Sequence, residues 1–240
     1  MDRHLNWDGC FNARDLGGMC LRGGGTTRWG AVVRADALDR LTVSGWTALR
    51  AHGIRTIVDL RNDEERREAV ARPEGITTVH VPLDDSDDTE FWQYCWDNEL
   101  DGSPLYFRPF LQRKADRCAA AVSEVARARP GGVVIHCGVG RDRTGLIAML
   151  LLALSGVDAG DIADDYELSA ARLPGLFAMQ GTEDQGPRIQ EILERNNTSA
   201  RAEILGAVAA LDFPSLLRAG GLLPEDVAAL RARLTGASDG

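Results

Sequence analysis

A cysteine and an arginine stand six positions apart in the stretch HCGVGRDRTG, residues 136–145. A thiolate is a strong nucleophile, and a guanidinium can hold two phosphoryl oxygens at once. The glycines around them leave backbone N–H groups free to surround an anion, above all where the turn opens a helix. Cys137 and Arg143 therefore predict attack on phosphorus, with the positive field of the turn holding Cys137 as a thiolate at neutral pH.

The bare spacing of these two residues is weak support, because it arises easily by chance. The chain has five cysteines, and Lys114 is the only lysine among its 27 basic residues, so about 0.5 such pairs are expected at random. The surrounding string is more specific. GVVI and His136 precede the cysteine, and Arg-Thr-Gly and an apolar run follow the turn. This context favours a catalytic loop over a cysteine that only packs in a buried turn.

The rest of the string fits the binding of a phosphate. Arg143 can follow the phosphoryl charge into the transition state, and Thr144 can donate its hydroxyl to the thiolate when a phosphocysteine breaks down. His136 either orients Cys137 through the backbone or is a satisfied core histidine, and we favour orientation. The residues predicted to bind the phosphate beside Cys137 and Arg143 are His136, Gly138, Val139, Gly140, Arg141 and Thr144.

A leaving alkoxide or phenoxide needs a proton, which a carboxylic acid beside the pocket can supply. Asp142 lies inside the loop. Asp84 and Asp85 follow the apolar stretch VHVPL and begin the acidic segment DDSDD, which could close over a substrate. The alternative for this segment is a solvated acidic turn, which we favour for Asp87 and Asp88. The sequence alone leaves the choice of acid open.

The order of apolar patterns predicts an α/β fold with a central, mostly parallel sheet flanked by helices. Strands are predicted at residues 31–34, 54–61, 76–83 and 132–137, and helices at 41–53, 62–70, 104–129 and 142–156. Further helices begin near Asp158, Pro187, Ser199 and Pro224. We expect a single domain over residues 1–240, with 158–220 as a helical lid or flanking subdomain. The aromatic stretch FWQYCW, residues 91–96, either anchors the loop after Asp88 or lines a pocket for an aromatic or nucleoside leaving group, and we favour the anchor.

The stretch HCGVGRDRTG resembles the H-C-x-x-G-K-D-R-T-G loop of the bacterial atypical tyrosine phosphatases. The dual- and triple-specificity members of that family act on phosphoproteins and phosphoinositides. NARDLGG, residues 12–18, is similar to the family's N-x-R-D-L-G-G motif. VVRADALDRL, GIRTIVDLRNDEE and LLRAGGLLPEDVAALRARL follow the family's layout. The resemblance covers nearly the whole chain. It implies a cysteine phosphatase fold, with the loop at the carboxyl end of a strand and helices that can cover the pocket.

The resemblance also implies roles for single residues. Arg14 and Asp15 would support the loop from behind, whereas the residues alone slightly favour an ion pair in a strand turn. The family's general acid matches Asp85 best, so Asp85 and Asp142 are the two predicted acids. Arg141 stands where the family has lysine. It keeps the positive charge but alters how a second phosphate or an inositol ring would be held.

Composition sets the remaining expectations. The net charge of −9 argues against binding to nucleic acid or an anionic membrane, so an anionic substrate needs a local positive site. Five cysteines without close pairs argue against a disulfide framework or a zinc site, and we expect no metal and no cofactor. The first ten residues lack an apolar signal segment, and the longest apolar run, residues 146–154, is too short to span a bilayer. We therefore expect a cytoplasmic protein.

These observations predict a metal-independent phosphate monoester hydrolase of the tyrosine or dual-specificity type, acting through a phosphocysteine at Cys137. Its partner would be a phosphorylated protein or a small phosphate monoester. The alternatives are a phosphatase for a small metabolite, nucleotide or phosphoinositide, a silent phosphate-binding module, and a loop for sulfur transfer or arsenate reduction. A silent binder would need no thiol, and no second cysteine lies near Cys137 in sequence to resolve arsenate chemistry. Pocket depth and the covering helices decide among the substrates.

Overall fold

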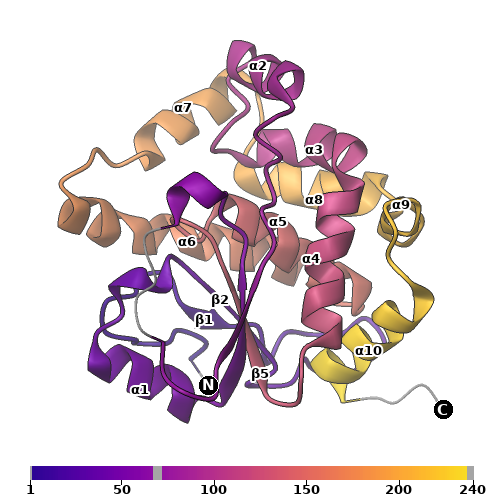
Figure 1. Ribbon diagram of the computed structural model, residues 1–240. Coiled ribbons are helices and arrows are strands. Elements are labelled where there is room, and N and C mark those ends of the chain that lie inside the picture. Colours follow the sequence, from indigo (N-terminus) through magenta and orange to yellow (C-terminus); the bar gives the residue numbers. More distant parts are fainter. Residues whose placement is uncertain (1, 67–71, 237–240) are drawn as a thin grey trace.

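The computed structural model describes residues 2–66 and 72–236, and a five-stranded sheet runs through the middle of this part (Figure 1). Its strand order is β1-β2-β5-β3-β4, with β1 antiparallel to β2 and the other neighbouring pairs parallel. The strands are β1 (Arg14–Asp15), β2 (Val32–Ala35), β3 (Ile54–Asp59), β4 (Thr77–His80) and β5 (Gly132–His136). The predicted mostly parallel sheet is confirmed.

The central strand β5 lies between β2 and β3 and is buried along its whole length. Its apolar, β-branched residues are typical of a parallel strand covered by helices on both faces. Ala35 of β2 and Asp59 of β3 both pair with His136, so three parallel strands end together beside Cys137. This edge of the sheet is where ligands bind in open parallel sheets.

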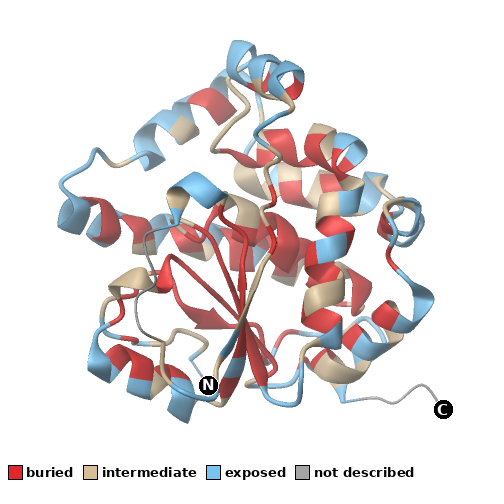
Figure 2. Cartoon of the chain, in the orientation of Figure 1, coloured by how far each residue is buried: buried red, intermediate tan, exposed pale blue. Residues whose placement is uncertain are grey.

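Helices cover both faces of the sheet (Figures 1 and 2). On one face α1 (Val43–Ala51) packs Trp46 and Leu49 against Ile57 and Val134. On the other face lies α5 (Asp142–Leu154), which is buried around its whole circumference. Among the helices of the described residues, none is long and apolar enough to cross a membrane. The remaining helices are α2 (Thr89–Asp97), α3 (Phe107–Arg113), α4 (Ala115–Arg127), α6 (Ala159–Gln180), α7 (Gly186–Arg195), α8 (Ala200–Ala210), α9 (Phe213–Ala219) and α10 (Pro224–Thr235).

The C-terminal helices begin where the sequence indicated. Asp158 caps α6 and Ser199 caps α8, each with a side-chain oxygen that accepts a backbone N–H of the first turn. The seven-residue α9 was not predicted, because its short apolar stretch carries little helical periodicity. Phe213 and Leu217 of α9 belong to the same core as α5 and the sheet, so segment 158–220 packs onto that core. Its role as a lid stays a prediction.

Two predicted helices differ in the structure. The helix predicted over 104–129 is interrupted at Lys114, which has φ −122° and ion-pairs with Asp85 and Asp88. The helix predicted over 62–70 begins as a 3-10 turn, Asp63–Glu65, and residues 67–71 lie outside the described part of the chain. The ion pairs of Lys114 join residues far apart in the sequence, which local periodicity does not report.

Replacement of Leu230 by alanine tests whether α10 shares one cooperative core with the sheet. Leu230 is fully buried in the cluster that includes α4 and α5, so Leu230→Ala is expected to lower the free energy of unfolding by about 2–5 kcal/mol. The control Leu223→Ala changes an exposed leucine that precedes the same helix and is expected to have little effect. Urea unfolding followed by tryptophan fluorescence and circular dichroism measures both. Two separate transitions, only one of them shifted, would contradict a shared core.

Candidate active site

The carboxyl end of β5 places Cys137 at the base of a turn that leads into α5. Cys137 is 2% exposed and directly follows the last residue of the strand. Helix α5 begins at Asp142, and no side chain in the described part of the chain caps it, so its first N–H groups stay available to the turn. Their partial positive charge stabilises a thiolate or a phosphate dianion beside them.

The turn requires glycine at one position for its conformation and at another for close packing. Gly140 has φ +73°, and a Cβ there would lie 2.4 Å from the carbonyl oxygen of Ala35. A Cβ at Gly145 would lie 2.9 Å from the ring of Tyr166, so α5 and α6 approach closely at this point. Gly138 has neither restriction, since its nearest contact would be 3.7 Å away. Of these three glycines, Gly140 is the one that needs the conformational freedom of glycine for a positive φ.

His136 and Thr144 lie beneath the turn and are fully buried. Nδ1 of His136 is 3.2 Å from the carbonyl oxygen of Cys137, and Nε2 is 3.7 Å from Oδ1 of Asp59. Burial lowers the pKa of His136, so its ring is neutral at pH 7. This geometry suits an orienting role for His136 and leaves it no surface for contact with a substrate.

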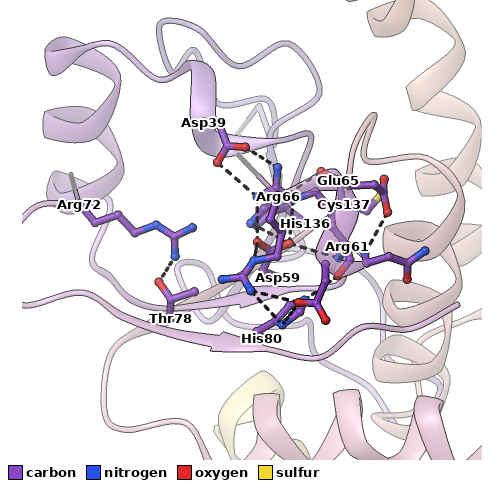
Figure 3. Close-up of polar contacts among 12 residues, drawn as sticks. Asp39, Asp59, Arg61, Glu65, Arg66, Arg72, Thr78, His80, His136 and Cys137 are labelled. Carbon is purple, nitrogen blue, oxygen red and sulfur yellow. Dashed lines mark hydrogen bonds and ion pairs between the residues drawn. The ribbon is translucent and has the colours of Figure 1, made fainter. Parts of the chain in front are cut away.

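An ion-pair network lies at the carboxyl end of β3, beside His136 and Cys137 (Figure 3). Arg61 donates from Nε and Nη2 to the two carboxylate oxygens of Asp59, at 2.9 and 2.8 Å, and it also donates to Asp39. Burial opposes ionisation of Asp59, but the hydrogen bonds from Arg61 hold its pKa at about 2. Figure 3 shows these residues next to His136 and Cys137. Sequence reasoning missed the network, although an aspartate and an arginine at the end of an apolar strand were a visible signal.

The guanidinium of Arg143 lies between two carboxylates. Both of its Nη atoms donate to Glu65, with 2.6 Å between Nη2 and Oε1, and Nη1 lies 3.0 Å from Oδ2 of Asp84. Burial alone would lower the pKa of Arg143, but the hydrogen bond to Glu65 and the proximity of Cys137 and Asp84 raise it. Burial likewise opposes ionisation of Glu65, yet Arg143 holds its pKa below the usual value. Glu65 therefore fixes the guanidinium beside the turn, a role that the sequence did not reveal.

Asp84 is the carboxyl group beside Arg143 whose surroundings raise its pKa. Burial raises the pKa of Asp84 to about 6, against the opposing charge of Arg143. The side-chain amide of Asn62 donates to Oδ2 at 3.2 Å, and the indole N–H of Trp92 donates to the Asp84 carbonyl oxygen at 3.1 Å. Trp92 belongs to α2, so the aromatic stretch 91–96 holds the segment that carries Asp84.

Asp85 and Asp142, the two predicted acids, are both engaged by cations. Asp85 accepts hydrogen bonds from Lys114 at 2.7 Å and from Arg117 at 2.9 Å, and the bond from Lys114 lowers its pKa. A carboxylate held ionised is a poor proton donor at neutral pH, so these surroundings argue against Asp85 and for its neighbour Asp84. Asp142 accepts hydrogen bonds from Nε and Nη2 of Arg141, at 2.9 and 3.1 Å.

Arg14 and Asp15 have separate partners, which argues against the ion pair between them that the residues alone favoured. Arg14 is fully buried and donates to Asp165 of α6 at 3.0 Å and to Oδ1 of Asn12 at 2.7 Å. Asp15 accepts two backbone N–H groups between β1 and β2 and lies 2.7 Å from Nε2 of His52. Asp15 therefore stabilises the connection between β1 and β2. Arg14, in contrast, lies behind the turn that follows Cys137.

Two cavities open beside the turn. One, of about 190 Å³, has Gly138, Val139 and Arg61 in its walls. The other, of about 220 Å³, lies between α6 and α7, with Arg141 in its wall. Arg141 also donates to Oε1 of Gln185 at 3.0 Å and so connects the turn to the start of α7. No group of three or more potential metal-ligating His, Cys, Asp or Glu side chains occurs in residues 2–66 and 72–236.

The sheet, the glycine turn and the helix that follows it define a cysteine-phosphatase-like fold. The sequence matches the Tyrosine phosphatase family over residues 5–236, and the protein belongs to this family. It is 30% identical over 148 residues to a tyrosine-protein phosphatase of Nostoc commune, covering 60% of this chain and 50% of the relative. It is 28% identical over 228 residues to the triple specificity protein phosphatase PtpB of Mycobacterium tuberculosis, covering 82% of this chain and 77% of the relative. The chain thus spans only half the length of the first relative.

A solved structure of TpbA from P. aeruginosa in complex with pTyr also aligns with the chain. It covers 78% of this chain and 84% of the other, with 18% identity and a TM-score of 0.36.

Replacement of Gly140 by alanine tests the conformation of the turn. Gly140→Ala is expected to cost about 1–3 kcal/mol of unfolding free energy for the positive φ alone, and the contact with the Ala35 carbonyl adds to this. The matched control is Gly138→Ala, where a Cβ meets nothing closer than 3.7 Å. Urea unfolding of the two variants measures the difference. Equal stabilities would contradict the conformation described for Gly140.

Proposed function

We propose that this protein hydrolyses phosphate monoesters through a covalent phosphocysteine at Cys137. The observation that carries the proposal is the grouping of Arg143 and Asp84 at the turn that begins with Cys137, which combines a fixed cation for a phosphoryl group with a carboxyl group of raised pKa. Membership of the tyrosine phosphatase family supports the same chemistry. The names of the relatives, a tyrosine-protein phosphatase and a triple specificity protein phosphatase, favour phosphorylated proteins as substrates.

In the first step the Cys137 thiolate attacks phosphorus. An S–P bond forms, and the bond from phosphorus to the leaving oxygen breaks. The N–H groups of the turn and of the first turn of α5 bind the phosphoryl oxygens, together with Arg143. Because Glu65 already holds the guanidinium, little freedom remains to be lost when the phosphate binds. Asp84 gives its proton to the leaving oxygen.

In the second step water attacks phosphorus, the S–P bond breaks, and its electron pair returns to Cys137. The Asp84 carboxylate takes a proton from the water, so the acid of the first step is the base of the second. The Thr144 hydroxyl is buried and has no hydrogen-bond partner within the described residues, which leaves it free to donate to the departing sulfur. The products are the alcohol and inorganic phosphate.

The choice of general acid gives a pH-dependent prediction. Asp84 must hold its proton to protonate the leaving oxygen, so kcat/KM with an alkyl phosphate is expected to fall as pH rises through about 6. Asp84→Asn removes this falling limb and lowers kcat by about 10²–10⁴-fold, with a smaller loss for an activated aryl phosphate. Profiles of kcat/KM against pH with both substrates measure the effect.

Asp85→Asn is the matched control, because it makes the same chemical change one residue away on a carboxylate held by Lys114 and Arg117. It is expected to keep the falling limb and most of the alkyl phosphate rate. If Asp85→Asn or Asp142→Asn removes the limb while Asp84→Asn does not, the acid is the other residue.

A phosphate-release panel tests the activity itself. The substrates are a phosphotyrosine peptide, a phosphoserine peptide, a phosphoinositide and a nucleoside monophosphate, each assayed with and without EDTA. We expect turnover of the phosphotyrosine peptide and its loss in Cys137→Ser. Activity that survives Cys137→Ser, or that disappears with EDTA, contradicts the thiolate mechanism. Preference for the phosphoinositide or the nucleotide would keep the mechanism and assign the alternative, a phosphatase of a small monoester.

A further inference from the structure

The carbonyl groups of Gly138, Val139 and Gly140 in the phosphate-binding turn accept hydrogen bonds from donors outside the turn. A turn whose N–H groups face an anion turns its carbonyl groups the other way, and each buried carbonyl needs a donor. The Gly138 carbonyl accepts the backbone N–H of Ala37 at 3.0 Å. The Val139 carbonyl accepts Nδ2 of Asn12 at 3.1 Å. Side chains outside the turn therefore contribute to its shape.

Arg34 of β2 supplies the next donors. Its Nη2 atom donates to the Gly140 carbonyl at 2.8 Å and lies 3.4 Å from the Arg141 carbonyl. Gly145 leaves room for this guanidinium, since a Cβ there would lie 3.3 Å from Nη2 of Arg34. Arg34 is 1% exposed, so water does not replace it as a donor. Arg34 thus fixes the orientation of the Gly140 carbonyl, whereas the Arg141 carbonyl also accepts the backbone N–H of Gly145 at 2.9 Å as part of α5.

Asp165 of α6 orients both side-chain donors. Its Oδ2 accepts Nη1 of Arg34 at 2.7 Å, and its Oδ1 accepts Nε of Arg14 at 3.0 Å. Arg14 in turn donates to Oδ1 of Asn12 at 2.7 Å, which leaves the Asn12 amide N–H₂ directed at the Val139 carbonyl. Helix α6 lies next to α5 in Figure 1. A single carboxylate on this helix therefore connects to the turn by two routes.

Charge explains why this carboxylate is needed. Arg14 and Arg34 are both buried, and burial together with the neighbouring Arg34 lowers the pKa of Arg14 to about 10. Two like charges held inside a protein require a counter-ion, and Asp165 is the buried carboxylate between them. The partly exposed Arg3 also donates to Asp165 at 2.7 Å. The cluster keeps a net positive charge behind the turn, which favours the binding of an anion in front of it.

We propose that Asp165 is a positioning residue for the phosphate-binding turn. Through Arg34, and through Arg14 and Asn12, it holds the carbonyl groups of Val139 and Gly140 away from the pocket so that the N–H groups face the phosphoryl oxygens. This inference rests on the proposed function. It assigns α6 a role in the geometry of the site, beyond that of a covering helix.

The test compares Asp165→Asn with the wild type and uses orthovanadate as the probe of the turn, since vanadate binds as an analogue of the pentacoordinate phosphoryl group. Asp165→Asn is expected to weaken vanadate inhibition by about 10- to 100-fold, as expected for lost hydrogen bonds to charged groups. The same factor should appear in kcat/KM for aryl and alkyl phosphates alike, because the turn acts on the phosphoryl group rather than on the leaving group. The matched control is Asp164→Asn, which changes an exposed carboxylate on the same helix and should leave both constants unchanged.

A second variant covers the case in which Asp165→Asn does not fold. Arg34→Lys keeps a cation beside Asp165, but one ammonium lacks the fork that reaches the carboxylate and the Gly140 carbonyl together. It should weaken vanadate inhibition in the same way. Thermal unfolding establishes that each variant is folded at the assay temperature. Folded variants with lowered melting temperatures but wild-type vanadate inhibition would overturn the positioning role and leave the proposed function intact. A wild-type protein that neither turns over monoesters nor binds vanadate would overturn both.

Discussion

The orientation of the peptide groups between Cys137 and α5 is the constraint on which the structure of this site depends. N–H groups that face an oxyanion imply carbonyl groups that face the protein interior, and those carbonyls need donors. β2 supplies Arg34 as one such donor, at a place that is fully buried. A buried guanidinium is costly unless it is paired, so Asp165 is required on the helix that packs there. Gly145 leaves space for this arrangement, because a Cβ there would lie 2.9 Å from the ring of Tyr166 and 3.3 Å from Nη2 of Arg34.

Burial and pairing separate the carboxylates around Arg143 into different roles. Glu65 is held ionised by two hydrogen bonds and positions the guanidinium. Asp84 faces the same guanidinium but is dominated by burial, which favours the protonated form up to about pH 6. Asp85, one residue later, accepts a hydrogen bond from Lys114, which lowers its pKa and keeps it ionised. Residue type therefore does not assign the acid. The surroundings do, because a carboxyl group can transfer a proton only where its environment keeps the proton near the working pH.

This distinction also marks how far the sequence could predict the site. The strand, turn and helix around Cys137 follow from local patterns, and the parallel sheet follows from their alternation along the chain. The choice between Asp84 and Asp85 does not, because adjacent side chains point in different directions and meet different elements. The Asp84 carboxyl group faces Asn62 and Arg143, and the Asp85 carboxylate faces Lys114 and Arg117. Lys114 is also where the helix predicted over 104–129 breaks, so one long-range ion pair accounts for two departures from local expectation.

Pairing also explains what changes when arginine occupies position 141, where the family's loop has lysine. Its fork contacts both oxygens of Asp142, and one Nη atom also reaches Gln185 ahead of α7. A lysine at this position would place one compact charge there and could not match both carboxylate oxygens in a plane. The arginine therefore engages Asp142 more completely than the family's residue would. With Asp142 tied to its neighbour and Asp85 tied to Lys114, Asp84 is the carboxyl group beside Arg143 that burial keeps suited to proton transfer.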